Sequence, residues 1–152
     1  RLRYSMTNPH IKRLGLQAHP EGGFYKETYR SQTSINCNDR QRDALTVNYL
    51  LEAGQHSAWH RVLSDEVWHY YDGAPLERFL MAPNCKDVKR IVLNAENRHA
   101  VIPAESWQAA QSTGADTLVG CCVSPGFDFS DFILLRDHPR HNSIDAQWQK
   151  LL

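Results

Sequence analysis

Short stretches of alternating or continuously apolar residues dominate the chain from Phe24 to Leu135. A period of two is the repeat of a β-strand with one buried face, and a short apolar run between turn residues suits a strand buried on both faces. This pattern predicts the following strands: Phe24–Arg30, Leu45–Leu51, Ser57–Val62, Glu66–Tyr71, Leu76–Met81, Lys89–Leu93, His99–Ile102, Trp107–Gln111, Thr117–Val123 and Phe132–Leu135.

Turn residues separate these runs, and many short strands at close spacing predict a β-sandwich or β-barrel, here over residues 23–136. The polar segment Ser31–Asp43 is expected to be a long loop. Two short helices flank the barrel in this interpretation. One covers residues 7–14, where a proline suits the first turn, and the other covers residues 143–152, where apolar residues share one face.

The length of 152 residues, with 41% hydrophobic and 22% charged residues, predicts one globular domain over residues 1–152. Seventeen basic and seventeen acidic side chains cancel, so we expect no nucleic acid polymer as partner. No apolar stretch is long enough to span a bilayer, so we expect no membrane association. Four cysteines without a C-x-x-C pair indicate reduced thiols and a cytoplasmic location.

The richest stretch for chemistry is Gly54–Gly73. If the strands at residues 57–62 and 66–71 pair around a turn, His60 lies on one face of the first strand, and Glu66 shares a face of the second with Tyr70. An imidazole and a carboxylate on facing strands can meet inside a barrel. This geometry suits an acid/base pair or a metal site.

The positions of Gly54, His60, Val62, Glu66 and Gly73 reproduce the spacing G-x5-H-x-H-x3-E-x6-G, apart from valine in place of the second histidine. This resembles the first motif of the cupin superfamily. Its second motif, G-x5-P-x-G-x2-H-x3-N, is matched only loosely. Pro103 is retained there, and Gln108 stands where the resemblance places the third metal-binding histidine.

Longer blocks resemble the cupin-5 branch, a group of small cupins of largely undetermined activity. These blocks are His19–Ser31, Trp59–Glu77, Ile102–Ala110 and Leu118–Leu135. The resemblance implies an all-β double-stranded β-helix, also called a jelly roll or cupin barrel, and we expect a small-molecule ligand in a pocket around His60 and Glu66 inside it. It also implies a homodimer, and a dimer would cover an open sheet edge.

The leading hypothesis is a metal-independent isomerase or epimerase that acts on a sugar or nucleotide-like metabolite. Here the chain resembles the metal-free sugar-nucleotide epimerases and isomerases of the cupin superfamily. His60 and Glu66 form the acid/base pair in this hypothesis, and a tyrosine returns the proton. Tyr70 is the catalytic candidate, and the sequence leaves Tyr25, Tyr29 and Tyr49 open as alternatives.

Two other hypotheses come from different classes of protein. The first is a dioxygenase-like enzyme in which His60, Glu66 and Gln108 hold one divalent metal ion, although an amide oxygen is a weak ligand beside imidazole. The second is a non-catalytic binding protein that has kept only the fold. Metal content and an open cavity distinguish the three hypotheses.

Further residues are expected to contact the ligand: Glu27, Tyr29, Arg30, Tyr49 and Gln108. In a regular strand Glu27 and Tyr29 share one face, and Arg30 points to the other. If Arg30 points inward, it favours an anionic ligand such as a phosphate or a carboxylate. The sequence does not fix which face is inside.

Overall fold

The computed structural model describes residues 7–152, and its first element is the short helix α1 (Pro9–Leu14). The helix begins two residues later than predicted, because Asn8 is the N-cap and its side chain accepts a hydrogen bond from the His10 amide. Gly15 ends it in the left-handed conformation, with φ of 63°.

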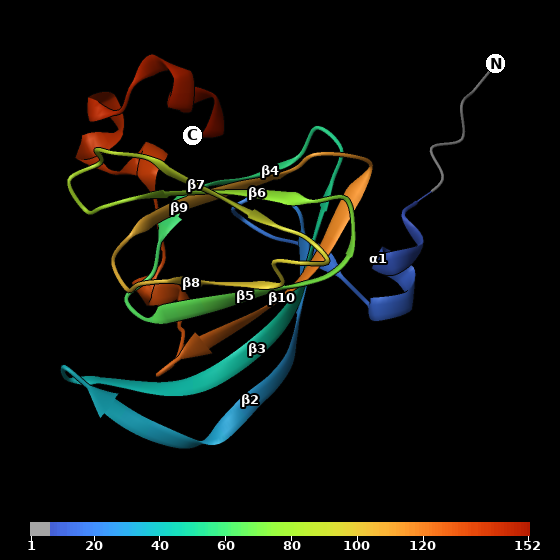
Figure 1. Ribbon diagram of the computed structural model, residues 1–152. Coiled ribbons are helices and arrows are strands. Elements are labelled where there is room, and N and C mark those ends of the chain that lie inside the picture. The colour runs from blue at the N-terminus through green and yellow to red at the C-terminus, as the bar shows by residue number, and fades with distance from the viewer. Residues whose placement is uncertain (1–6) are drawn as a thin grey trace.

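Two antiparallel sheets face each other and form the barrel (Figure 1). In spatial order the first sheet contains β1 (Gln17–Ala18), β2 (Phe24–Cys37), β3 (Arg40–Glu52), β10 (Asp116–Ser124), β5 (Asp65–Gly73) and β8 (His99–Ile102). The second contains β11 (Ile133–Leu134), β4 (His56–Arg61), β9 (Trp107–Ser112), β6 (Leu76–Met81) and β7 (Lys89–Leu93). This architecture confirms the predicted all-β jelly roll, and each predicted strand is present.

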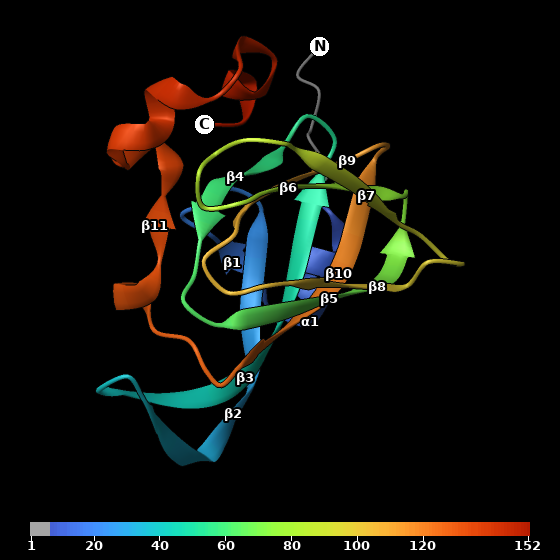
Figure 2. The same ribbon diagram turned by 60° about the vertical axis from the view of Figure 1, so that its left-hand side comes forward.

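The predicted loop over Ser31–Asp43 is wrong. β2 and β3 continue through this segment as a hairpin, with Ser34 opposite Asp43 and Cys37 opposite Arg40. Asn38 and Asp39 form the turn, both with positive φ. The hairpin extends beyond the barrel (Figures 1 and 2), where the residues of β2 are largely exposed on both faces and those of β3 are mostly half-buried. Such a strand has no alternation of apolar and polar residues, so its sequence looks like a loop.

The C-terminal segment forms short 3-10 helices instead of the single helix predicted over residues 143–152. They are η1 (Phe129–Asp131), η2 (Leu135–Asp137), η3 (Pro139–Ser143) and η4 (Ala146–Leu151). Ile144 is extended between the last two, with φ of −87° and ψ of 149°, and its side chain is buried. The expected apolar face therefore exists, but the backbone reaches it through an irregular path.

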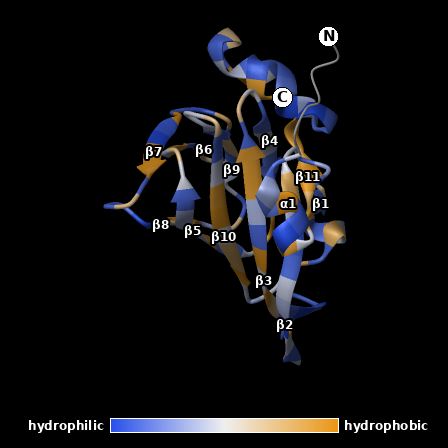
Figure 3. Cartoon of the chain, turned by 90° about the vertical axis from the view of Figure 1, so that its right-hand side faces the viewer, coloured by the Kyte–Doolittle hydropathy of each residue, from blue (hydrophilic) through white to orange (hydrophobic). Residues whose placement is uncertain are grey.

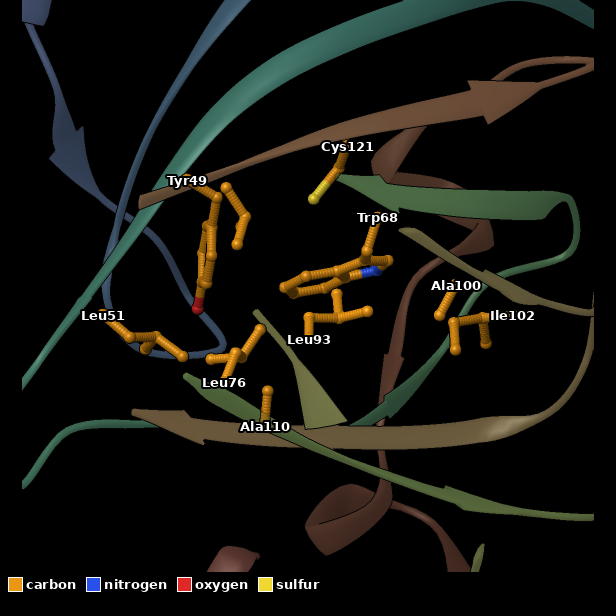
Figure 4. Packing of buried hydrophobic residues seen from close by; sticks show 10 residues of the cluster. Tyr49, Leu51, Trp68, Leu76, Leu93, Ala100, Ile102, Ala110 and Cys121 are labelled. Carbon is orange, nitrogen blue, oxygen red and sulfur yellow. The ribbon is translucent and has the colours of Figure 1, made fainter. Parts of the chain in front are cut away.

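Buried hydrophobic residues form two main clusters, one inside the barrel and one outside it. The inner cluster fills the space between the sheets (Figure 4) and includes Tyr49, Leu51, Trp68, Leu76, Leu93, Ala100, Ile102, Ala110, Val119 and Cys121. The outer cluster lies between the second sheet and the C-terminal segment, where the Trp59 indole N–H donates to the Trp148 carbonyl at 3.0 Å. In Figure 3, much of β10 and parts of β3 are hydrophobic, whereas the far end of β2 is hydrophilic.

All four cysteines are free. Cys121 points into the barrel, and its neighbour Cys122 points to the other face of β10, where its Sγ lies 3.9 Å from His69 Nε2. Within residues 7–152, no helix has the length and apolar character needed to cross a membrane.

Candidate functional site

A cavity of about 310 Å³ opens at one end of the barrel interior. Its wall begins where β10 pairs with its neighbours, with Cys121 opposite Val47 and with Val123 opposite both Leu45 and Glu66. The remaining lining residues come from β1 to β4, from the position just after β4, from the turn before β2 and from the segment that follows β10. They are Gln17, His19, Glu21, Tyr25, Glu27, Arg30, Tyr49, His60, Val62, Phe127, Asp128, Phe129 and Phe132.

The turn that precedes β2 delivers a carboxylate into this cavity. Gly22 and Gly23 have φ of 106° and 73°, values that residues with a side chain rarely adopt. A Cβ atom at Gly22 would also collide with the His56 carbonyl at the start of β4. Both features let the turn lie directly against β4, where the Glu21 carbonyl accepts from the Ala58 amide at 2.7 Å. Glu21 is consequently buried among the site residues.

His60 is bound through both of its ring nitrogens. Its Nδ1 donates to the carbonyl of Ala58 at 2.7 Å, and its Nε2 lies 2.7 Å from Oε2 of Glu21. Because a carbonyl only accepts, Nδ1 must carry a proton. The Glu21 carboxylate then holds a second proton on Nε2, which makes the pair an imidazolium and a carboxylate.

The carboxylate of Glu66 belongs to a second polar chain. Its Oε2 accepts from the Gln108 side-chain amide at 2.9 Å, and the Gln108 oxygen accepts in turn from Arg78. Arg78 is fully buried, and its guanidinium lies 3.6 Å from the centre of the Trp68 ring. Gln108 therefore links a buried cation to the cavity carboxylate and fixes the orientation of Glu66.

The two carboxyl groups have pKa values shifted in opposite directions. Burial alone would raise the pKa of Glu21, but the charge and hydrogen bond of His60, with smaller contributions from His19 and Arg78, lower it to about 2. For Glu66, burial raises the pKa and the Glu21 charge adds to this, while the charge of His60 opposes it. The net result is a raised pKa, so Glu21 is the ionised group and Glu66 is the one that binds a proton more readily.

The pKa of His60 is raised as well. Burial on its own would lower it, but the charge of Glu21 and the hydrogen bond to Glu21 outweigh burial, and the charge of Glu66 acts in the same direction. His19 behaves differently, because burial lowers its pKa. Its Nδ1 accepts from the Glu21 amide at 3.0 Å, which is consistent with a neutral ring.

The structure changes how the predicted pair of His60 and Glu66 is arranged. Both side chains line the cavity, but β4 and β5 lie in opposite sheets and do not form the expected hairpin. The imidazole is hydrogen-bonded to Glu21, not to Glu66. His60 and Glu66 therefore face the cavity from two sides and act on each other through their charges.

The predicted tyrosines are distributed over different environments. Tyr70 does not line the cavity; it packs against the inner hydrophobic cluster, and its hydroxyl donates to the Gly73 carbonyl. Its assignment as a catalytic residue is therefore not supported by its position. Tyr49 and Tyr25 do line the cavity, and the Tyr49 hydroxyl donates to the Gly22 carbonyl. Tyr29 is 60% exposed on the outside.

A β-bulge explains why Tyr29 lies outside. The pairing of β2 with β3 shifts between Glu27 and Tyr29, so the strict alternation of faces fails at this point. Glu27 and Arg30 therefore share the cavity side, and Arg30 Nη2 lies 2.7 Å from Glu27 Oε1. The expectation that Glu27 and Tyr29 share one face and Arg30 the other is wrong for this reason.

The residues considered as metal ligands do not fit a divalent ion. Within the described part of the chain, no group of three or more His, Cys, Asp or Glu side chains is arranged to hold one. His60 uses both ring nitrogens, and the Gln108 oxygen accepts from Arg78. Binding a metal would require these lone pairs, next to a buried guanidinium.

Aromatic side chains after β10 form the mouth of the cavity. The ring centroid of Phe129 lies 5.1 Å from that of Phe127 and 6.0 Å from that of Phe132. The segment is attached to the projecting hairpin through Asp131, which binds Arg40 at 2.6 Å and Arg42 at 2.7 Å. These ion pairs link the hairpin, which had been predicted as a loop, to the entrance of the cavity.

Sequence reasoning missed Glu21, His19 and Arg78 as site residues. The glycines of the stretch His19–Gly23 form a tight turn, and the same turn carries the acid that binds His60. A usable signal was present, because two adjacent glycines beside a histidine and a glutamate allow a close approach to another strand. Arg78 has no such signal, because one arginine in a β-strand usually points to solvent.

Comparisons with known proteins agree with this architecture. A sequence profile of the family Cupin_5, described as "Cupin superfamily (DUF985)", matches residues 8–135. No protein with a curated description matches the chain. Among solved structures, a protein of Shewanella oneidensis has 33% sequence identity and a TM-score of 0.77, with coverage of 96% of this chain and 98% of that one.

Two further solved structures extend the comparison. A hypothetical protein from Leishmania major has 26% identity and a TM-score of 0.81, covering 93% of this chain and 96% of that one. A 3,4-ketoisomerase from Helicobacter canadensis has 16% identity and a TM-score of 0.51, covering 72% of this chain and 89% of that one. At that identity the ketoisomerase shows a shared fold only.

Proposed function

The chain belongs to the Cupin_5 (DUF985) family of the cupin superfamily, and on that premise we propose that it binds a small polar metabolite in the barrel cavity and moves a proton on it, as a metal-independent isomerase or epimerase. One observation carries the proposal. Glu66 and the His60–Glu21 pair line the same cavity from opposite sheets, so a bound sugar-like or nucleotide-like compound meets a proton-exchanging group on each side.

Glu66 is the proposed proton acceptor. A raised pKa makes its carboxylate a stronger base and its protonated form easy to reach, which suits a group that must both take and return a proton. Gln108 holds one oxygen of Glu66 through the 2.9 Å hydrogen bond. The positive charges of His60 and Arg78 favour the ionised form before the proton is taken.

The proposed step needs no oxidant and no further reactant. Glu66 removes a proton from a carbon next to a carbonyl group of the ligand, and the electron pair moves to the carbonyl oxygen as an enolate. In an isomerisation of an α-hydroxy carbonyl compound, the proton of the hydroxyl on that carbon moves to the enolate oxygen, so that the new carbonyl group forms there. The same carboxyl group then returns its proton to the former carbonyl carbon. In an epimerisation the imidazolium of His60 delivers a proton to the opposite face, since it approaches from the other sheet.

Exchange of carbon-bound hydrogen with solvent tests this proposal. The protein is incubated in D₂O with a panel of aldoses, ketoses and nucleoside-diphosphate sugars, and deuterium incorporation is followed by ¹H NMR. We expect exchange in at least one member of the panel. Glu66→Gln should lower its rate by about 100-fold or more, the usual contribution of a general acid or base.

Tyr70→Phe is the matched control, because this side chain lies outside the cavity and should leave the exchange rate unchanged. Equal rates in the wild type and Glu66→Gln would refute the proposed role of Glu66. Binding without any exchange would leave a non-catalytic binding protein as the function. If no compound binds and none exchanges, the proposal fails as a whole.

A further inference from the structure

We infer that the ligand of this cavity is an uncharged, polyhydroxylated ring of monosaccharide size, and not a phosphate-bearing or nucleotide-linked compound. The inference rests on the proposed function, in which this cavity holds the ligand, and it narrows the substrate class. It follows from how the charged side chains of the cavity are already paired, and from the shape of the entrance.

Both cations that line the cavity are committed to carboxylates. The imidazolium of His60 is neutralised by Glu21 at 2.7 Å. Arg30 gives its Nε and Nη2 to Glu27 Oε1, at 3.2 and 2.7 Å, and its Nη1 to the Phe127 carbonyl at 3.3 Å. Among residues 7–152, no lysine lines the cavity. Phosphate recognition in proteins relies on free Arg or Lys side chains or on convergent backbone amides, and this cavity offers no such cation.

The acidic side of the lining has an excess. Glu66 and Asp128 also face the cavity, and neither has a cationic partner among its hydrogen bonds. Asp128 accepts from the Ser130 amide at 2.9 Å, and Glu66 accepts from the neutral Gln108 amide. An anionic ligand would lose its hydration and meet these carboxyl groups. Hydroxyl groups, in contrast, can donate to the same oxygens without a net charge.

The entrance presents an aromatic surface to the ligand. Phe129 is 49% exposed, which is unusual for a phenylalanine, and it lies at the mouth beside Phe127 and Phe132. Its ring is 6.0 Å from that of His19. A sugar ring has one face of C–H groups that packs on aromatic carbon while its hydroxyls reach the polar floor.

The volume agrees with a small ligand. At about 310 Å³ the cavity is at the lower end of the roughly 300–1,000 Å³ that ligand sites usually occupy. A single sugar ring fits this space together with a few waters. A nucleotide would have to extend past Phe129 into solvent.

Matched ligands test the charge argument. Isothermal titration calorimetry compares a panel of neutral hexoses with their 6-phosphates and with the corresponding nucleoside-diphosphate hexoses. We expect at least one neutral hexose to bind wild-type protein about tenfold or more tightly than its 6-phosphate. Glu27→Gln releases Arg30 from its partner and should improve the binding of the 6-phosphate about tenfold relative to that of the neutral hexose.

Glu77→Gln is the control. It also releases an arginine, Arg90, which lies 2.6 Å from Glu77 outside the cavity lining, and it should change neither affinity.

Stronger binding of a 6-phosphate or a nucleotide-linked hexose to the wild type would overturn the inference. If that compound also exchanged hydrogen with solvent, the proposed function would stand. The inference would also be overturned if Glu27→Gln preferred the neutral hexose over its 6-phosphate as strongly as the wild type does. The pairing of Arg30 with Glu27 would then not be what excludes anions. If no panel member binds or exchanges, both proposals fall.

Discussion

The two ends of the barrel interior are built from the same strands but have opposite chemistry. On β5 the inward side chains run from Glu66, in the cavity, to Trp68, which is 1% exposed in the packed cluster. On β3 the corresponding change occurs between Val47, which lines the cavity, and Leu51 in the packed cluster. On β5, two residues along the strand separate the ionisable cavity from the hydrophobic interior.

Arg78 and Gln108 occupy the boundary between these regions. The Arg78 guanidinium stacks on Trp68 of the packed end and reaches Glu66 of the open end through Gln108. A buried cation without a carboxylate in contact is costly, so such an arrangement suggests a functional role. The comparison teaches that the packed end supplies the stability that lets the open end hold charged groups in a cavity.

The largest expected effect comes from a matched pair of leucine truncations. Leu93→Ala, in the packed end, should lower the free energy of unfolding by about 2–5 kcal/mol, because it opens a void among close-packed side chains. Leu45→Ala removes the same atoms from the cavity wall and should cost less than about 2 kcal/mol, since they already border a void. Urea denaturation measures both values. Equal costs would show that the two ends are packed alike.

Glu21→Gln should lower the free energy of unfolding at neutral pH by about 2 kcal/mol, because it removes a charge-assisted hydrogen bond to His60. The pKa of Glu21 is about 2 in the folded state and 4.5 without the protein environment. Its contribution is therefore present above pH 4.5 and is lost as the pH falls toward 2. Denaturation between these pH values should show the wild type converging on the variant. A constant difference would contradict the ionised state of Glu21.

Glu66→Gln should raise the free energy of unfolding at neutral pH, and by less than Glu21→Gln lowers it. Because the folded-state pKa of Glu66 is raised above 4.5, the stability linked to its proton is present below pH 4.5 and is lost as the pH rises through the folded-state pKa. The variant keeps an oxygen that accepts from Gln108 and has no proton to lose. Its stability relative to the wild type should therefore increase over that pH range. Parallel stability curves in urea would contradict the raised pKa.

Asp131→Asn should have the smallest effect on stability, roughly 1 kcal/mol, because its partners Arg40 and Arg42 remain partly exposed. The substitution should change the mobility of the cavity mouth more than it changes the stability of the whole protein. Hydrogen–deuterium exchange should increase in the segment containing Phe127 and Phe132, which Asp131 attaches to the hairpin. Unchanged exchange there would show that the ion pairs do not position the entrance.

The fold was predictable because its signal is local. Strands such as Leu76–Met81 and Lys89–Leu93 have the bounds that their apolar patterns predict. The hairpin over residues 31–43 was missed because its exposed strands carry no pattern of burial. The C-terminal helix was misjudged because an apolar face constrains which side chains are buried, not the path of the backbone between them.

The chemistry of the candidate site was predicted most directly where a motif spacing exists. His60 and Glu66 have that spacing, and both line the cavity. The partner of His60 could not be predicted, because Glu21 comes from a turn 39 positions earlier in the chain and reaches β4 only through tertiary contact. The faces of Tyr29 and Arg30 depended on a bulge, which changes the faces of the side chains that follow it and leaves no mark in the composition.

The family profile ends at residue 135, whereas the layer over Trp59, Phe79 and Trp107 is completed by side chains that follow that position, Ile144 and Leu151 among them. A fragment trimmed to the profile would present an indole-rich sheet to water and would be prone to self-association. The practical domain limit for expression or for fusion partners is thus set by this outer layer and not by sequence similarity.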